Sequence, residues 1–242
     1  MRLIKLLFST LLLTYTSLSF ASIQIMSTRV ILNAAEKEQS FIIRNVGESP
    51  SLVQLWLADK NSSEMKIQED LPLFITPPVG RINADRRKVF RIFPTEQAGD
   101  ILPQDRESMF WINVLDVPEQ DANSNAGNKL NLAFRTRIKL FYRPVNIKGT
   151  LIKSAEEVIW KKRQTKNGCE ITATNNSPFH VTLVNMKLKQ GEATVAALPG
   201  EMLSPYSSQT FLFKEAKSAN INLLDFDYIS DLGAFINVKQ KL

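Results

Sequence analysis

The stretch that decides the fold is Leu130–Pro144, which reads LNLAFRTRIKLFYRP. Its apolar residues fall on every second position, with Thr136 as the one gap: Leu130, Leu132, Phe134, Ile138, Leu140 and Tyr142. Cationic residues lie between them: Arg135, Arg137, Lys139 and Arg143. Successive side chains of a strand point to opposite faces. The stretch therefore predicts a long β-strand with one apolar face and one cationic face.

Shorter β-rich runs precede this strand, with turn residues between them. They are Ile23–Ile31, Phe41–Arg44, Leu52–Leu57, Val89–Phe93 and Met109–Leu115. Six or seven short strands in about 120 residues favour a β-sandwich over alternating strands and helices. No segment shows a long helical period, so the sequence predicts an all-β fold.

After Pro144 the pattern starts again. The expected strands are Val158–Lys161, Cys169–Thr174, His180–Leu188, Gln209–Phe213, Asp225–Ile229 and Phe235–Val238. We place the boundary at residues 145–148, which predicts two tandem domains over residues 22–144 and 148–242. Each has the length of an ordinary small domain.

The N-terminus has the pattern of a secretory signal peptide over residues 1–21. Arg2 and Lys5 are followed by the apolar run Leu6–Leu13 and the cleavage-type sequence Ser19–Ala21. The apolar run is short for a membrane-spanning helix, and no later segment is apolar enough to span a bilayer. The sequence predicts an exported protein that is not embedded in the membrane.

The charge and the cysteine content limit which classes of binding partner and which covalent links are expected. The formal charge of the whole chain is +6, and its cations are spread out instead of forming one basic tract, which disfavours nucleic acid as a partner. A modest positive balance fits acidic proteins or anionic surfaces equally well. Cys169 is the single cysteine, so no intramolecular disulfide is possible. It is expected to be a small buried residue, with an exposed thiol as the alternative.

The residues that common catalytic sites require are missing. His180 is the single histidine, and its setting after Pro178 indicates a packing residue. A metal site built from several histidines is excluded, and no glycine-rich phosphate loop or Cys-x-x-Cys sequence occurs. We expect neither enzymatic activity nor a metal or other cofactor.

Four ordered motifs, however, resemble those of the PapD-like periplasmic chaperones of the chaperone–usher pathway. They are Ser27–Ile31 (STRVI), Thr76–Pro78 (TPP), Leu102–Asn113 (LPQDRESMFWIN) and Arg137–Pro144 (RIKLFYRP). The second half matches more loosely, at Asn175–Phe179 and Tyr228–Gly233.

The resemblance implies a boomerang of two immunoglobulin-like sandwiches that binds pilus subunits and delivers them to an outer-membrane usher. Pilus subunits of this pathway are sandwiches that lack their last strand, and the chaperone inserts a strand of its own. Here Leu130, Leu132 and Phe134 match the apolar knobs of that strand. Arg29 and Lys139 match the pair of cations that anchors the subunit's C-terminal carboxylate.

The parity of Lys139 is at odds with a simple version of this arrangement. Lys139 is an odd number of residues from each knob, so it should point away from the knob face unless the strand twists or bulges.

The resemblance also implies a charge network between the domains. Glu107, Arg143 and Asp231 match its members, and its expected role is to set the angle between the domains.

Two features depart from parts of the family. Some members carry a disulfide in the second domain, which one cysteine cannot form. The loop Val117–Lys129 before the strand is short to intermediate, which favours subunits of rod-like or thicker pili.

Two further hypotheses accompany this interpretation. The alternative function is a secreted two-domain adhesion or structural module, which explains the fold and export but not the cationic, apolar strand. In addition, an exposed apolar strand is an aggregation hazard, so the free protein is expected to cap itself as a weak dimer through Leu130–Phe134.

Overall fold

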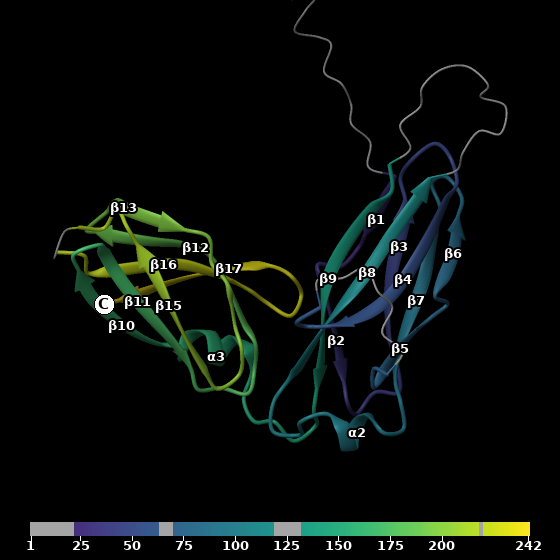
Figure 1. The fold of residues 1–242 in the computed structure, drawn as a ribbon, viewed down its shortest axis with the longest axis horizontal. Coiled ribbons are helices and arrows are strands. Elements are labelled where there is room, and N and C mark those ends of the chain that lie inside the picture. The colour runs from purple at the N-terminus through teal and green to yellow at the C-terminus, as the bar shows by residue number, and fades with distance from the viewer. Residues whose placement is uncertain (1–21, 63–69, 119–131, 218–219) are drawn as a thin grey trace, which may run out of the picture.

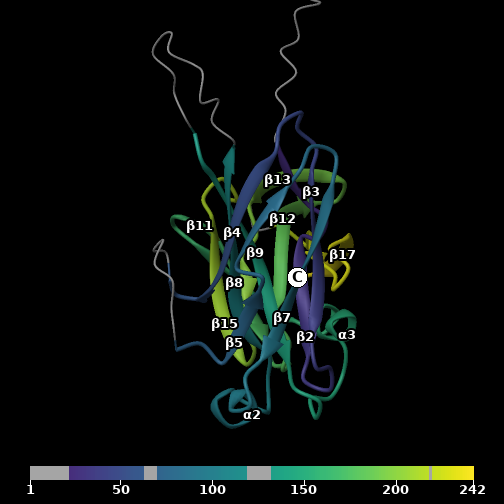
Figure 2. The same cartoon turned by 90° about the vertical axis from the view of Figure 1, so that its right-hand side faces the viewer.

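The computed structural model describes residues 22–62, 70–118, 132–217 and 220–242. It consists almost entirely of strands, arranged as two β-sandwiches that meet at an angle like the arms of a boomerang (Figure 1). After a quarter turn the two sandwiches lie one behind the other (Figure 2). The expected all-β, two-sandwich fold is confirmed. The signal-peptide region and Leu130 lie outside the described residues.

The first domain has nine strands and a short helix among its described residues. They are β1 (Ile23–Ile25), β2 (Arg29–Asn33), β3 (Gln39–Asn45), β4 (Ser51–Asp59), β5 (Leu73–Thr76), β6 (Val79–Ile82), β7 (Arg87–Pro94), α2 (Ala98–Ile101), β8 (Ser108–Pro118) and β9 (Phe134–Arg143). The back sheet has the order β1-β3-β7-β5, and the front sheet has the order β2-β9-β8-β4-β6. The core between them includes Leu32, Ile43, Phe90, Ile112 and Leu140, all fully buried.

The N-terminal chain changes sheet between β1 and β2. β1 pairs with β3 in the back sheet, whereas β2 runs parallel to β9 in the front sheet. The expected single strand Ile23–Ile31 is therefore wrong, because residues 26–28 carry the chain from one sheet to the other. Because the chain enters the front sheet only at Arg29, β2 pairs with β9 only from Lys139 onward.

The long strand begins later than its alternation predicts. β9 starts at Phe134 instead of Leu130, and Leu132 precedes it without strand structure. From Ile138 onward its even-numbered side chains enter the core. The strand ends at Arg143, just before Pro144, whose missing N–H cannot continue a ladder.

The second domain is a separate sandwich with its own core. Its elements are α3 (Leu151–Glu156), β10 (Ile159–Thr165), β11 (Gly168–Asn175), β12 (Val181–Gln190), β13 (Ala193–Leu198), β14 (Met202–Leu203), β15 (Ser207–Phe213), β16 (Leu223–Ile229) and β17 (Phe235–Lys241). One sheet has the order β10-β11-β15; the other is β13-β12-β16-β17, with β14 also paired to β12. Cys169 is fully buried in this core, and burial raises the pKa of its thiol.

Among the described residues, no helix is long and apolar enough to cross a bilayer.

Candidate subunit-binding edge and interdomain cleft

One edge of β9 is open over half of its length. β8 pairs with β9 from Phe134 to Tyr142 without interruption. On the other side, β2 pairs with β9 only from Lys139 to Arg143. Within the described ranges, no strand covers the second edge from Phe134 to Ile138. Their backbone groups on that side can therefore pair with an added strand.

The apolar side chains beside this open edge are exposed. Leu132 is 51% exposed and Phe134 is 63% exposed, whereas Ile138 on the same face is only 7% exposed. The even-numbered side chains of β9 are thus buried in the domain's own core near the C-terminal end of the strand and exposed near its N-terminal end. Two of the three predicted knobs are available to another molecule, and Leu130 lies outside the described residues.

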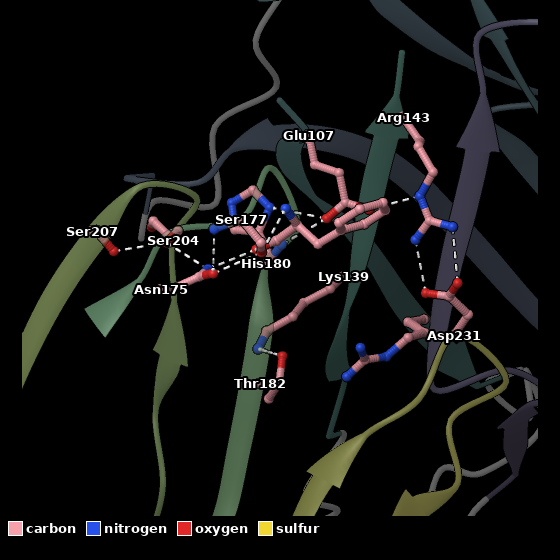
Figure 3. A network of polar contacts seen from close by, with 12 residues as sticks. Glu107, Lys139, Arg143, Asn175, Ser177, His180, Thr182, Ser204, Ser207 and Asp231 are labelled. Carbon is pink, nitrogen blue, oxygen red and sulfur yellow. Dashed lines mark hydrogen bonds and ion pairs between the residues drawn. The ribbon is translucent and has the colours of Figure 1, made fainter. Parts of the chain in front are cut away.

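The two predicted anchor cations lie side by side where the open edge ends. Arg29 and Lys139 are direct register partners of the β2–β9 ladder. Arg29 donates from Nη1 to the carbonyl oxygen of Ile229 at 3.1 Å. Lys139 donates from Nζ to Oγ1 of Thr182 at 3.4 Å (Figure 3). Both cations therefore reach across to the second domain.

Burial makes this pair unusual. Desolvation, and then the nearby charge of Arg29, lower the pKa of Lys139 from 10.5 to about 8. Desolvation also lowers the pKa of Arg29, although the charges of Asp231 and Glu107 act in the opposite direction. Arg29 is 7% exposed, and its Nε is buried without a hydrogen-bond partner. Two partly desolvated cations with spare donors make a site that favours a carboxylate.

The structure answers the question of parity. The β8–β9 register runs without a shift past Lys139, so no bulge turns this side chain toward the knob face. Lys139 points toward the second domain, and Leu132 and Phe134 belong to the opposite face of the chain. Within β9, Lys139 and Phe134 are thus on different sides of the strand, and a guest would have to contact both.

Glu107, Arg143 and Asp231 meet at the domain junction. Arg143 donates from Nε to Oε1 of Glu107 at 2.8 Å and holds both carboxylate oxygens of Asp231 at 2.8 Å (Figure 3). Burial alone would lower the pKa of Arg143, but its hydrogen bonds and ion pairs outweigh burial and raise it. A bidentate arginine–carboxylate pair is directional as well as strong, so this cluster restrains the orientation of one domain against the other.

His180 completes the cluster, which the sequence did not indicate. Its backbone N–H donates to Oε2 of Glu107 at 2.8 Å, and its Nδ1 lies 3.4 Å from the same oxygen. Its ring also packs against Phe141, with 5.3 Å between centroids. The expected packing role is thus only part of what His180 does. In the described part of the chain, no group of three or more histidine, cysteine or acidic residues could hold a metal ion.

Sequence models of a known family match both domains. A sequence model for the N-terminal domain of PapD-type pili and flagellar-assembly chaperones matches residues 22–148. A second, for the C-terminal domain of the pili assembly chaperone PapD, matches residues 153–240. The chain belongs to the PapD family of pilus assembly chaperones. The family is one of chaperones and not of enzymes.

Curated relatives of this PapD-family chaperone span most of both chains. The probable fimbrial chaperone YadV of Escherichia coli is 35% identical over 240 residues, covering 95% of this chain and 94% of YadV. The chaperone protein FimB/FhaD of Bordetella pertussis is 33% identical over 208 residues, covering 86% and 84%.

Solved structures show the same architecture. The crystal structure of the YadV chaperone matches with a TM-score of 0.77 at 31% identity, over 92% of this chain and 100% of that one. The SafB chaperone of Salmonella enterica, solved in complex with the SafA pilin, matches with a TM-score of 0.74 at 25% identity, over 93% and 99%.

The PapD-family chaperone also has another contact between its domains that sequence reasoning missed. The guanidinium of Arg106 lies over the ring of Tyr206, 4.9 Å from its centroid. The Tyr206 hydroxyl donates to the carbonyl oxygen of Asp105 at 3.4 Å. Tyr206 carries no local signal for this role, because its partner is a hundred residues away in the chain.

Proposed function

We propose that this chaperone binds a pilus subunit along the open edge of β9, with the C-terminal carboxylate of the subunit held by Arg29 and Lys139. The observation that carries the proposal is the position of these two cations, Arg29 buried and Lys139 partly buried, at the end of an unpaired strand edge. Strand addition supplies backbone hydrogen bonds, and side-chain pockets supply specificity.

The geometry selects the direction of the guest strand. The anchor lies at the Lys139 end of the open edge, and β2 occupies the edge beyond it. A guest strand that ends in a carboxylate at Lys139 must therefore approach from Leu132 and run parallel to β9. Residues 132–138 would span about 20 Å at roughly 3.3 Å per residue.

The two contacts contribute differently. Full burial of a leucine or phenylalanine is worth about 1.5–3 kcal/mol. Leu132 is already about half covered and Phe134 about one third covered, so each has about 1–2 kcal/mol left to gain. A charge-assisted hydrogen bond is worth about 1.5–3 kcal/mol, and at the anchor it forms only with a negatively charged group such as the terminal carboxylate of the subunit. Together the two knobs have about 2–4 kcal/mol to gain, and two cations that each make one such bond contribute a comparable amount. Capture therefore needs both contacts, and the anchor also sets the register of binding.

Export and delivery complete the proposal. The signal-type pattern of residues 1–21 supports cleavage after Ala21 and release into the periplasm. The ion-pair network of Arg143 with Glu107 and Asp231 holds the two domains at the angle that brings Thr182 and Ile229 to the anchor. The loaded chaperone then passes the subunit to an outer-membrane usher.

Coexpression with a pilin from the same genome tests the proposal. The wild-type protein should yield a one-to-one complex from the periplasm, whereas Lys139→Ala should yield free, folded chaperone. Lys161→Ala is the matched control, because Lys161 is an exposed lysine on the edge strand β10. Equal recovery of complex with Lys139→Ala and with wild type would contradict the anchor.

A further inference from the structure

The outer face of the back sheet is a second exposed surface with unusual chemistry. Residues of β3, β5 and β7 that alternate with buried core residues point outward here. From one end to the other, the cross-strand pairs are Phe74 with Phe93, Arg91 with Ser40, Val89 with Ile42, and Arg87 with Arg44. We call this surface the back face. Apolar and arginine-containing rows alternate along it.

The apolar rows of the back face are open to solvent. Phe74 is 49% exposed and Val89 is 47% exposed. The rings of Phe74 and Phe93 stack with 5.2 Å between centroids and 13° between planes. A stacked aromatic pair on an open sheet forms a rigid apolar contact, and such exposed patches often mark interaction sites.

The opposite end of the back face is a cationic hollow. Its volume is about 540 Å³, and its lining is Met26, Ile42, Arg44, Asp85, Arg86 and Arg87. Arg44 lies 3.8 Å from Asp85. Among the described ion pairs, none involves Arg86 or Arg87. The hollow thus keeps two uncompensated guanidinium groups beside two apolar side chains.

We propose that the back face binds the surface of an anionic phospholipid bilayer. Guanidinium groups match phosphate geometry with two parallel hydrogen bonds, and the hollow places Arg86 and Arg87 where a lipid headgroup can enter. Phenylalanine rings suit the boundary between headgroups and acyl chains. The unbalanced positive charge favours anionic lipid.

The dimensions of the face suit a flat partner. Arg87 and Phe93 lie six residues apart on β7, which is about 20 Å along the strand. One rigid sheet therefore presents the cationic hollow and the aromatic pair at the same time. β5 and β7 lie on the side of the first domain away from the second domain (Figure 1). Lys139 and the open edge of β9 belong to the front sheet, so binding through the back face leaves them uncovered.

Vesicle cosedimentation with the purified chaperone tests the proposal. The vesicles contain either equal parts phosphatidylglycerol and phosphatidylcholine or phosphatidylcholine alone. The wild-type protein should bind the anionic vesicles and not the neutral ones. Each cation near an anionic surface contributes about fivefold to binding, so Arg86→Glu with Arg87→Glu should weaken binding at least about 25-fold. Phe74→Thr with Val89→Thr should weaken it too.

A charge-matched control separates the back face from overall charge. Lys161→Glu with Lys166→Glu makes the same charge change on exposed residues of the second domain and should leave most of the binding intact. Equal losses in the two double charge variants would overturn the proposal, as would equal binding of wild type to neutral vesicles. Analytical ultracentrifugation without lipid tests whether a second molecule of the chaperone covers the back face instead. A dimer that Phe74→Thr abolishes, with no vesicle binding, also overturns it.

Discussion

Replacing Lys139 by methionine should stabilise the free chaperone and abolish subunit capture. Burial lowers the pKa of Lys139 from 10.5 to about 8, which means that folding removes a charged amine from water without full compensation. At 1.36 kcal/mol per pH unit, this difference corresponds to about 3 kcal/mol. Partial exposure screens the charge, so we expect a gain of about 1–3 kcal/mol. Methionine keeps the length of the side chain and removes the charge.

Thermal unfolding of the purified protein measures this gain. One kcal/mol shifts the Tm of a chain of this size by about 2–4 °C, so Lys139→Met should raise Tm by at least about 2 °C at pH 7. Lys161→Met, an exposed lysine in β10, should leave Tm unchanged.

The pH dependence of the stability difference gives a second check. The folded pKa of Lys139 lies below the unfolded one, so below pH 8 the lysine is charged in both states and the fold bears the full penalty. Between pH 8 and 10.5 the folded protein loses this charge, and the difference between variant and wild type should shrink. A lower Tm for Lys139→Met, or a difference that does not change with pH, would refute the desolvation argument.

Three further predictions concern the knobs, the anchor and the network. Phe134→Ser should change stability by less than about 1 kcal/mol because the ring is exposed, yet it should weaken pilin binding about 5- to 30-fold and remove any concentration-dependent dimer seen by sedimentation. Calorimetric affinity for the pilin should fall about tenfold per pH unit above pH 8, where Lys139 loses its proton; a flat profile to pH 10 would exclude the lysine as anchor. Glu107→Gln leaves Arg143 paired with Asp231 alone and should lower the free energy of unfolding by about 1–3 kcal/mol in chemical denaturation. Asp231→Asn should cost less, because Asp231 is more exposed than Glu107, and should broaden the distribution of interdomain angles in solution scattering; equal costs for the two variants would contradict this reasoning.

Alternation in the sequence predicts most of the strands but not which of them end early or change sheet. Ile23–Ile31 reads as one strand, and nothing local marks the crossing between β1 and β2. β5 and β6 were missed because each has four residues and they flank the turn at Pro77 and Pro78. Such short strands form because a neighbouring strand pairs with them, and that neighbour is distant in sequence.

The same limit applies to the binding strand. Phe134 and Ile138 have the same parity, and alternation alone treats them alike. Phe134 is 63% exposed and Ile138 is 7% exposed, since only one of them lies where the domain's core continues. The sequence therefore identifies the apolar face, but three-dimensional packing decides which part of it is free for a guest.

The polar residues of the junction divide in a similar way. Arg29, Lys139 and the members of the ion-pair network were predicted by resemblance to a family and not by charge pattern, because isolated surface cations look the same in sequence. His180 could not be assigned to Glu107 at all, since 73 residues separate them. The residues next to His180 in the sequence do not indicate such a contact.

A crystal structure of the chaperone with its pilin tests the central claim most directly. We expect a guest strand parallel to β9 beside residues 132–138, with its terminal carboxylate within hydrogen-bond distance of Lys139 Nζ and Arg29. A guest that runs antiparallel, or one whose C-terminus lies in solvent away from both cations, would contradict it.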